Sequence, residues 1–269
     1  MDNMIMSTSD TSEHLRTVQC ATGANLDARI EIHRRFGAGQ EPWQHWLFDQ
    51  IDAPPNCRIL ELGCGTGRLW QDNADRIPAG WEITLSDFSE GMLEATMQNV
   101  GAIGRPFELQ SINAESIPYP DDRFDIVLAN FMLYHVPNKP KAYLEIARVL
   151  KPTGKLIAAT NGMTHMREIM ELGERFELID GTEPNYSSFS LENGSEQLSA
   201  VFRSVKLLRL EGGLRVTEAQ PVIDYLLSMH TRTPSAEAIA GAMAYVEKII
   251  ETDGAFNVQK ASGLFVASC

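Results

Sequence analysis

The chain has 269 residues, of which 43% are hydrophobic and 22% are charged. This composition supports a packed core and excludes disordered, collagen-like and coiled-coil proteins. The 36 acidic and 23 basic residues give a net charge of −13, so the mean electrostatic field of the protein repels phosphate backbones and anionic lipid surfaces. We therefore expect neither a nucleic acid nor a membrane as a partner.

The cysteines, the histidines and the first residues narrow the class of protein further. The four cysteines have no C-x-x-C spacing and are too few for a disulfide framework, so we expect reduced thiols in a cytoplasmic protein. The six histidines have no metal-ligand spacing with Cys, Asp or Glu, so we expect no metal. Residues 1–18 lack the basic and apolar regions of a signal peptide, and no uncharged apolar run approaches the ~18 residues of a transmembrane helix.

The first helical pattern lies in residues 25–51, where apolar residues recur at helical spacing. Arg29 and His33 are four residues apart and therefore lie on one face of that helix. Residues 52–56 contain two prolines and end the pattern. We expect residues 1–55 to form a helical N-terminal cap.

Short β-rich runs then alternate with helix-length segments. This alternation predicts an α/β protein with a doubly wound parallel sheet, because parallel neighbours need crossover connections. The expected strands are residues 58–62, 82–86, 107–112, 124–130 and 155–160, with a helix over 139–150. Beyond Thr160 we expect an amphipathic stretch over 162–176, a loop-like run over 180–197, strands over 204–211 and 257–268, and helices near 218–229 and 235–252.

The strongest signal is a run of three glycines at alternate positions, Gly63, Gly65 and Gly67, directly after an apolar strand that ends in an acidic residue. In a doubly wound sheet, ligands bind beyond the carboxyl ends of the strands, and glycine lets the backbone approach a ligand without a Cβ in the way. We interpret this run as a cofactor-binding loop rather than a simple tight turn. The third glycine of a dinucleotide fingerprint would fall at Arg68, which weighs against a nicotinamide cofactor.

Residues Glu61–Gly67 fit the form (D/E)-x-G-x-G-x-G at every position, and in this the chain resembles class I S-adenosylmethionine-dependent methyltransferases. The resemblance covers roughly residues 56–160. It implies S-adenosylmethionine as the cofactor and a Rossmann-like, mostly parallel sheet with a closing antiparallel strand. It further implies a methyltransferase domain over residues 56–269, with a lid insertion at about 161–203.

The resemblance also assigns cofactor contacts, starting with Glu61, Gly63, Gly65 and Gly67 of the glycine run. Asp87 ends the second expected strand, where the family's acidic residue accepts hydrogen bonds from the ribose hydroxyls; the alternative role for Asp87 is that of a helix cap. Met92 matches the position that packs against adenine, Ala114 and Glu115 would lie along the adenine edge, and Asn130 would lie beside the methionine part.

Two further residues have competing interpretations. His135 stands where many small-molecule methyltransferases have a histidine, and an ordinary imidazole pKa of about 6.5 would let it act as a general base near neutrality. The alternative is that His135 only braces its loop. Arg29 could pair with the carboxylate of the cofactor, or it could belong to a solvated helix face.

These observations predict methyl transfer to a small organic molecule by in-line displacement. The sequence Asn130–Leu133 lacks the N-P-P-Y pattern of enzymes that methylate exocyclic amino groups, which agrees with the charge argument against nucleic acid. Two alternatives stay open, a non-catalytic S-adenosylmethionine-binding module and a nicotinamide-dependent oxidoreductase. The motifs specify neither the acceptor atom nor the oligomeric state.

Overall fold

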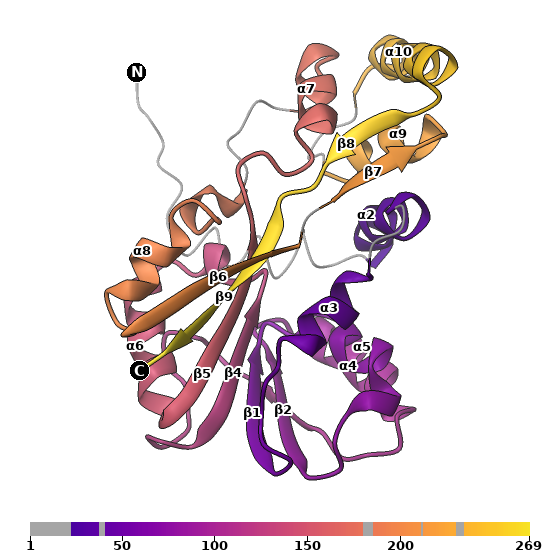
Figure 1. Ribbon diagram of the computed structural model, residues 1–269. Coiled ribbons are helices and arrows are strands. Elements are labelled where there is room, and N and C mark those ends of the chain that lie inside the picture. Colours follow the sequence, from indigo (N-terminus) through magenta and orange to yellow (C-terminus); the bar gives the residue numbers. More distant parts are fainter. Residues whose placement is uncertain (1–22, 38–40, 180–184, 211, 230–233) are drawn as a thin grey trace.

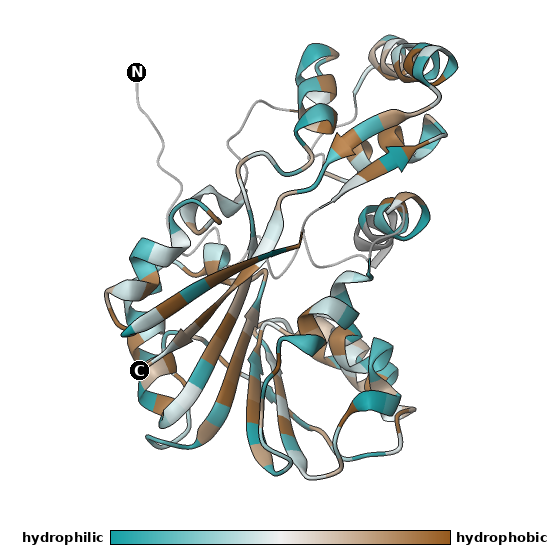
Figure 2. Cartoon of the chain, viewed as in Figure 1, coloured by the Kyte–Doolittle hydropathy of each residue, from teal (hydrophilic) through white to brown (hydrophobic). Residues whose placement is uncertain are grey.

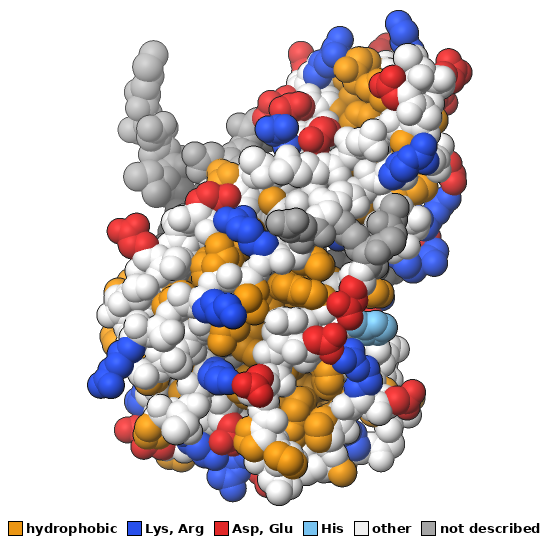
Figure 3. All heavy atoms as spheres, viewed as in Figure 1, with side chains coloured by type: hydrophobic (Ala, Val, Ile, Leu, Met, Phe, Trp, Pro, Cys, Tyr) orange, Lys and Arg blue, Asp and Glu red, His pale blue; other side chains and the backbone are white. Residues whose placement is uncertain are grey.

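The computed structural model describes residues 23–37, 41–179, 185–210, 212–229 and 234–269. These residues form two lobes, a main lobe built on a large sheet and a smaller lobe at one edge of that sheet (Figure 1). We call the smaller lobe the cap; it consists of the helices α2, α7, α9 and α10 and the strands β7 and β8. Charged side chains of both signs cover both lobes, and hydrophobic side chains gather in the middle of the visible face of the main lobe (Figure 3).

The main sheet contains seven strands of the described chain in the order β3-β2-β1-β4-β5-β9-β6. Their bounds are β1 Cys57–Leu62, β2 Trp81–Asp87, β3 Glu108–Ser111, β4 Phe124–Asn130, β5 Leu150–Asn161, β6 Ser204–Leu210 and β9 Ser262–Ser268. Strands β1 to β5 pair in parallel, and β9 pairs antiparallel with both β5 and β6. The predicted Rossmann-like, mostly parallel sheet with a closing antiparallel strand is confirmed.

Helices cover both faces of the main sheet, as its two-sided apolar strands require. On one face lie α3 Trp43–Asp49, α4 Arg68–Asp72 and α5 Glu90–Gly101, and on the other lie α6 Lys139–Val149 and α8 Gly194–Ser199 (Figure 1). Each face has its own buried cluster, with Trp70 and Leu128 in the first and Val127 and Phe265 in the second. The strands are accordingly the most hydrophobic part of the chain (Figure 2).

The cap has a separate hydrophobic core. Its elements are α2 Gly23–Phe36, α7 Arg167–Arg175, α9 Gln220–Leu227 and α10 Ala236–Asp253, with the antiparallel pair β7 Gly213–Val216 and β8 Phe256–Gln259. Ile32, Ile169 and Leu226 are buried together there. None of the helices in the described ranges is long and apolar enough to cross a membrane.

The strand expected over residues 257–268 is two strands in two different sheets, so this prediction was wrong in its extent. β8 belongs to the cap and β9 to the main sheet. Between them the Lys260 N–H donates to the carbonyl of Gly212 and the Ala261 carbonyl accepts from Gly162 N–H, so the chain changes partners at this point. The sequence between them, Lys260 and Ala261, contains no proline or glycine, so it does not reveal where one sheet ends.

Other segments also divide between the lobes. The expected helical region 25–51 contains two helices, α2 in the cap and α3 in the main lobe. Within residues 161–203, α7 packs in the cap core, whereas Phe189 and Leu198 join the core of the main lobe. The run expected to be loop-like contains the 3-10 helix η4 Asn185–Ser188 and part of α8, and β7 was not expected at all.

The packing of α8 on the sheet can be tested at Gly194, where an added Cβ would come within 2.5 and 2.7 Å of the ring of buried Phe265. We expect Gly194→Ala to lower the free energy of unfolding by ~1–3 kcal/mol, because the buried ring has to move. At Gly101, in the last turn of α5, a Cβ meets nothing within 4 Å, so Gly101→Ala is a matched control with an unchanged or slightly raised value. Urea unfolding measures both variants, and equal values would contradict this packing.

Candidate active site

Strands β1 and β4 are neighbours in the sheet, and their carboxyl ends lie side by side. The strand order runs from β1 to β2 and β3 on one side and from β4 to β5 on the other, so it reverses at this pair. The chain leaves β1 toward α4 and leaves β4 toward α6, so the two following loops diverge, and in doubly wound sheets a crevice for ligands forms between such loops. Ligands of doubly wound sheets bind at such a switch point. The glycine loop, Gly63–Gly67, follows β1, and Asn130 ends β4. The structure therefore brings both predicted site segments together.

All three glycines of the glycine loop have left-handed backbone, with φ of 67° at Gly63, 59° at Gly65 and 75° at Gly67. A Cβ at Gly63 would lie 2.7 Å from the Met132 Cβ, and one at Gly67 would lie 3.0 Å from side-chain atoms of α5. A Cβ at Gly65 would meet nothing within 4 Å. Gly63 and Gly67 are thus needed for packing, whereas Gly65 borders open space.

Asp87 holds the glycine loop from the end of β2. Its Oδ2 accepts a hydrogen bond from the Gly65 N–H at 3.0 Å, and its Oδ1 accepts one from the Ser89 N–H at 2.9 Å. Burial raises the pKa of Asp87, and these backbone hydrogen bonds oppose the rise. The side chain of Ser89, not that of Asp87, caps α5 by accepting from the Met92 N–H at 3.4 Å. The helix-cap alternative for Asp87 is therefore wrong, and each carboxylate oxygen retains capacity for a further donor.

Glu61 is 2% exposed, and its carboxylate is engaged by two neighbouring side chains. It accepts hydrogen bonds from Trp70 Nε1 at 2.6 Å and from Asn130 Nδ2 at 2.8 Å. Burial raises the pKa of Glu61 to about 7. The bond to Glu61 fixes the orientation of the Asn130 amide, whose Oδ1 is buried and has no hydrogen-bond partner among the described residues. Asn130 thus holds a free acceptor at the end of β4.

His135 lies in the 3-10 helix η3 Leu133–His135, which follows β4 by three residues. The connecting residue Phe131 has a left-handed φ of 53°, and its ring lies 5.0 Å from that of Trp43 on α3. Burial lowers the pKa of His135 to about 4, with a smaller contribution from Lys139. The expectation of an ordinary imidazole pKa was therefore wrong, and His135 is neutral at neutral pH.

The remaining predicted site residues lie at three places. Met92 is half-buried in the first turn of α5, and Ala114 is buried in the loop after β3. The Glu115 carboxylate accepts from the Asn138 N–H at 2.9 Å, at the start of α6. Arg29 lies in the cap, where it donates to the hydroxyl of Ser228 at 3.0 Å and to its carbonyl at 2.7 Å.

Two residues of α5 support the glycine loop and were missed from the sequence. Thr96 Oγ1 donates to the Gly65 carbonyl at 2.7 Å, and Asn99 Nδ2 donates to the Thr66 carbonyl at 2.9 Å. Thr96 is fully buried. A threonine on the apolar face of an amphipathic helix is the one signal that indicated such a role, since a buried hydroxyl needs a partner.

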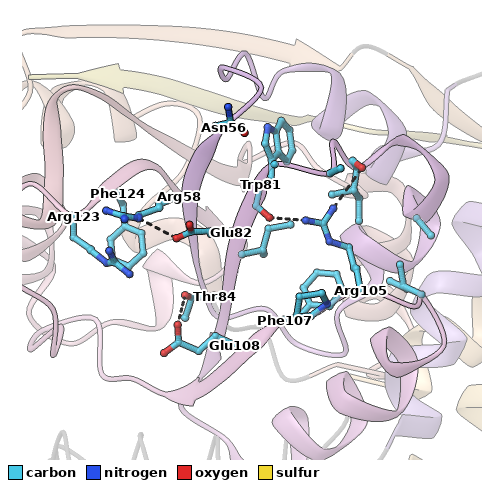
Figure 4. Close-up of a pocket in the computed structure, with 17 residues that line it drawn as sticks. Asn56, Arg58, Trp81, Glu82, Thr84, Arg105, Phe107, Glu108, Arg123 and Phe124 are labelled. Carbon is cyan, nitrogen blue, oxygen red and sulfur yellow. Dashed lines mark hydrogen bonds and ion pairs between the residues drawn. The ribbon is translucent and has the colours of Figure 1, made fainter.

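A hollow of about 920 Å³ lies at the opposite edge of the sheet, at the amino ends of the strands (Figure 4). Arg58, Trp81 and Glu82 are among the residues that line it, and Arg105 donates across it to the Trp81 carbonyl at 2.5 Å. Ligands of this sheet type bind at the carboxyl edge, so this hollow is not the candidate active site. In the residues that the structure describes, no group of three or more His, Cys, Asp or Glu side chains could hold a metal ion.

Comparisons with known proteins agree with this geometry. Residues 60–158 match the family model described as a methyltransferase domain. Over 118 residues, the chain is 36% identical to the ubiquinone/menaquinone biosynthesis C-methyltransferase UbiE of Vibrio vulnificus. The aligned segment covers 43% of this chain and 45% of that protein. It is 34% identical over 118 residues to the UbiE protein of Shewanella pealeana, covering 43% and 47% of the two chains. The chain thus spans about half the length of these relatives.

Two solved structures share the fold over most of the chain. The cyclase SpnF has a TM-score of 0.61 and 17% identity, covering 96% of both chains. Phosphoethanolamine N-methyltransferase 2 of Haemonchus contortus, in complex with S-adenosylmethionine, has a TM-score of 0.60 and 16% identity, covering 100% of this chain and 61% of that one. The family match over residues 60–158 and the relatives thus point to a methyltransferase domain, and the two solved structures share the fold of the chain.

The buried histidines of the structure predict a sensitivity to acid. Burial lowers the pKa of His33 and His135 to about 4 and that of His165 to about 3. When the pH is lowered below about 6.5, these imidazoles gain protons in the unfolded chain but not yet in the folded protein. The free energy of unfolding therefore decreases by up to ~1.4 kcal/mol per pH unit for each histidine. Glu61 opposes this decrease, because its raised pKa lets the folded protein bind a proton there at a higher pH than the unfolded chain does.

Urea unfolding at several pH values between 7 and 5 measures this dependence. We expect His33→Phe to reduce the slope of the free energy of unfolding against pH by the equivalent of about one bound proton, because the variant lacks one imidazole with a lowered pKa. The control is His45→Phe on α3, where the imidazole Nε2 lies 3.1 Å from the Asp72 carbonyl at the surface. A slope that His33→Phe leaves unchanged would contradict the burial of His33.

Proposed function

We propose that the chain binds S-adenosylmethionine in the crevice between the glycine loop and Asn130 and transfers its methyl group to a small organic molecule. Two observations carry the proposal: the open space at Gly65, whose N–H binds the Asp87 carboxylate, and the unpartnered Asn130 Oδ1 at the end of the strand next to β1. The UbiE relatives are named as C-methyltransferases, and the Haemonchus contortus enzyme is an N-methyltransferase seen with this cofactor. Both support the proposal.

The proposed contacts follow from the donors and acceptors at the crevice. Asp87 accepts from the ribose hydroxyls with the capacity that its bonds to Gly65 and Ser89 leave free. Asn130 Oδ1 accepts from the ammonium group of the methionine part, which gives this buried oxygen a partner. Glu61 acts by fixing the Asn130 amide rather than by direct contact. Gly63 and Gly67 shape the loop around this space.

Further contacts are proposed for the adenine and for the cofactor carboxylate. Met92 is half-buried at the start of α5 and supplies an apolar side chain suited to a base, whereas Ala114 is buried after β3. The Glu115 carboxylate is bonded to Asn138 and its N–H to Asn113, so its carbonyl is the group that could contribute. Arg29 would reach the cofactor carboxylate only with the nitrogen that its two bonds to Ser228 leave free.

When bound, the cofactor supplies an electrophilic methyl group on a positively charged sulfur. The contribution of the chain is then to align the acceptor and exclude water, which together can lower the barrier by ~7–11 kcal/mol. His135 is a neutral imidazole on the loop beside Asn130, so it can take the proton of an acceptor hydroxyl or amine without first losing one. A positioned general base adds ~10²–10⁴-fold where the acceptor must be deprotonated, and the lowered pKa, which makes His135 a weaker base, favours the lower end of that range.

The proposal includes the small-molecule acceptor and the cytoplasmic location expected from the sequence. On the face shown in Figure 3, lysine and arginine side chains are interspersed with acidic ones and form no basic stripe, which supports an acceptor other than nucleic acid. Cys57, Cys64 and Cys269 are free thiols, which supports a reducing compartment.

A methyl-transfer assay decides between the proposed enzyme and a non-catalytic binding module. Calorimetry with S-adenosylmethionine and with NAD comes first, and we expect binding of S-adenosylmethionine only. The protein is then incubated with cofactor carrying a labelled methyl group and panels of phenols, carboxylates and amines. Transfer of label supports the enzyme. Binding without transfer to any panel supports the module, or a reaction of another kind on the same fold, as the cyclase SpnF illustrates.

The first variant that tests the site is Gly65→Ala. Its Cβ enters the open space beside the loop, so we expect the Kd for S-adenosylmethionine to rise about tenfold or more. The matched control is Gly104→Ala in the loop before β3, because Gly104 has a similar φ of 76° and a Cβ there also meets nothing within 4 Å. Both variants should lose ~1 kcal/mol of stability for the left-handed backbone, and only Gly65→Ala should weaken binding in calorimetry. Equal Kd values would place the cofactor elsewhere.

The second variant is His135→Ala. If His135 takes a proton from the acceptor, kcat falls by ~10²-fold or more while the Kd for the cofactor barely changes. Because the pKa of His135 is about 4, its protonation does not change kcat of the wild-type enzyme across neutral pH, and kcat falls only as the pH approaches that value. A modest loss in His135→Ala, with a pH profile that matches the wild type in the acid range, would show that His135 only braces its loop.

A further inference from the structure

A continuous row of imidazole and phenol rings runs from the candidate active site into the cap. Successive ring centroids are 4.5 to 6.4 Å apart, and the rings come from η3, η4, the turn after β5, α2 and α9. In order, the row consists of His135, Tyr134, Tyr186, His165, His33 and Tyr225. It thus connects the main lobe to the cap, where α2 packs against α9 (Figure 1). Four of these six residues have no role in the proposed cofactor site or in packing of the sheet.

The two histidines in the middle of the row have unequal hydrogen bonding. Their rings stack with an interplanar angle of 25° and centroids 6.1 Å apart. His165 Nδ1 accepts from the Ala261 N–H and lies within hydrogen-bond distance of Ser262 Oγ, each at 3.3 Å. His33 Nδ1 is buried and has no hydrogen-bond partner in the described part of the chain. A buried polar atom without a partner is rare in proteins, so this nitrogen is available to bond a group from outside the chain.

The charges around these histidines favour an anionic ligand. Burial and the positive charge of Lys260 lower the pKa of both imidazoles, so they are neutral and able to donate one hydrogen bond each. Arg29 lies one turn before His33 on α2 and is bonded to Ser228, with no ion pair to a described carboxylate. The acidic group that faces the row is Glu192, near Tyr186, and both its oxygens lie within hydrogen-bond distance of the Met163 N–H. Positive charge thus predominates around His33.

We propose that His33 and His165 form an acceptor subsite that binds the anionic oxygen of a planar aromatic molecule, a carboxylate or an ionised phenol. The body of this molecule lies along Tyr186 and Tyr134, whose rings offer faces and edges for aromatic contact, and its reacting end points toward His135. The subsite rests on the proposed function, since it names the class of acceptor for the same crevice. It assigns His33 and His165 to binding, not to proton transfer.

The first test observes the imidazoles directly in the wild-type protein. Histidine side-chain signals are followed by nitrogen-detected NMR while benzoate or 4-nitrophenolate is added, with and without saturating S-adenosylhomocysteine. We expect saturable shifts of the His33 and His165 signals and an unchanged His45 signal. Benzamide, the neutral analogue of benzoate, should leave all three unchanged at the same concentration. The two anions separate a carboxylate from a phenolate as the preferred group.

The second test compares two variants with the same substitution. His33→Phe keeps an aromatic ring in the row but removes the unpartnered nitrogen, and we expect it to weaken benzoate binding about tenfold or more without changing the Kd for S-adenosylhomocysteine. His45→Phe should change neither affinity. A thermal scan checks that both variants are folded, and the NMR titration of the wild type does not depend on them.

The outcomes separate the two proposals. Protein that binds S-adenosylhomocysteine but shows no shift of His33 and His165 with either anion, or equal shifts with benzamide, overturns the acceptor subsite and leaves the proposed function intact. Protein that binds no S-adenosylhomocysteine overturns the proposed function. Benzoate binding that His33→Phe leaves unchanged assigns the row to packing between the lobes and also overturns the subsite.

Discussion

The crevice at the switch point depends on one buried carboxylate. Glu61 accepts hydrogen bonds from Trp70 on α4 and from Asn130 at the end of β4, so one side chain joins the strand before the glycine loop to the helix after it and to the neighbouring strand. A buried carboxylate is costly unless its oxygens are bonded, and two donors offset that cost. The same bonds set the position of α4 and therefore the path of the glycine loop, whose N–H at Gly65 binds Asp87. The side of the site proposed for the cofactor is thus one hydrogen-bonded unit.

The cap is a second body with its own core, and the chain passes between it and the main lobe at several points. One crossing lies between β8 and β9, where Ala261 donates to His165 and Ser262 contacts both His165 and Asn161 at the end of β5. The turn after β5 and the start of β9 are therefore tied together at the base of the cap. Because the cap core forms without the main sheet, its composition can change while the cofactor side stays the same. A fold of this kind accommodates different acceptors.

The sequence predicted the sheet, the glycine loop and the Asp87 position because these are local patterns with a strict period or spacing. It failed where the structure depends on contacts between distant segments. The separation of β8 from β9 follows from the bond between Lys260 and Gly212, 48 residues apart. Thr96 supports Gly65 from a helix 31 residues away, and His33 meets His165 only through the tertiary fold. The depressed pKa of His135 is likewise a property of burial, which residue type alone does not reveal.

The distribution of charge links the two halves of the site. The carboxylates Glu61 and Asp87 lie at the ends of β1 and β2, on the side proposed for a cofactor that carries a positive sulfur. The imidazoles of His33 and His165 lie on the cap side and that of His135 lies after β4, and burial keeps all three neutral. A protonated imidazole would destabilise a nearby sulfonium ion by like-charge repulsion, whereas a neutral imidazole does not. An anionic acceptor on the cap side would in turn be attracted toward the positive sulfur, so the same segregation of charge that binds the two molecules also brings their reacting groups together.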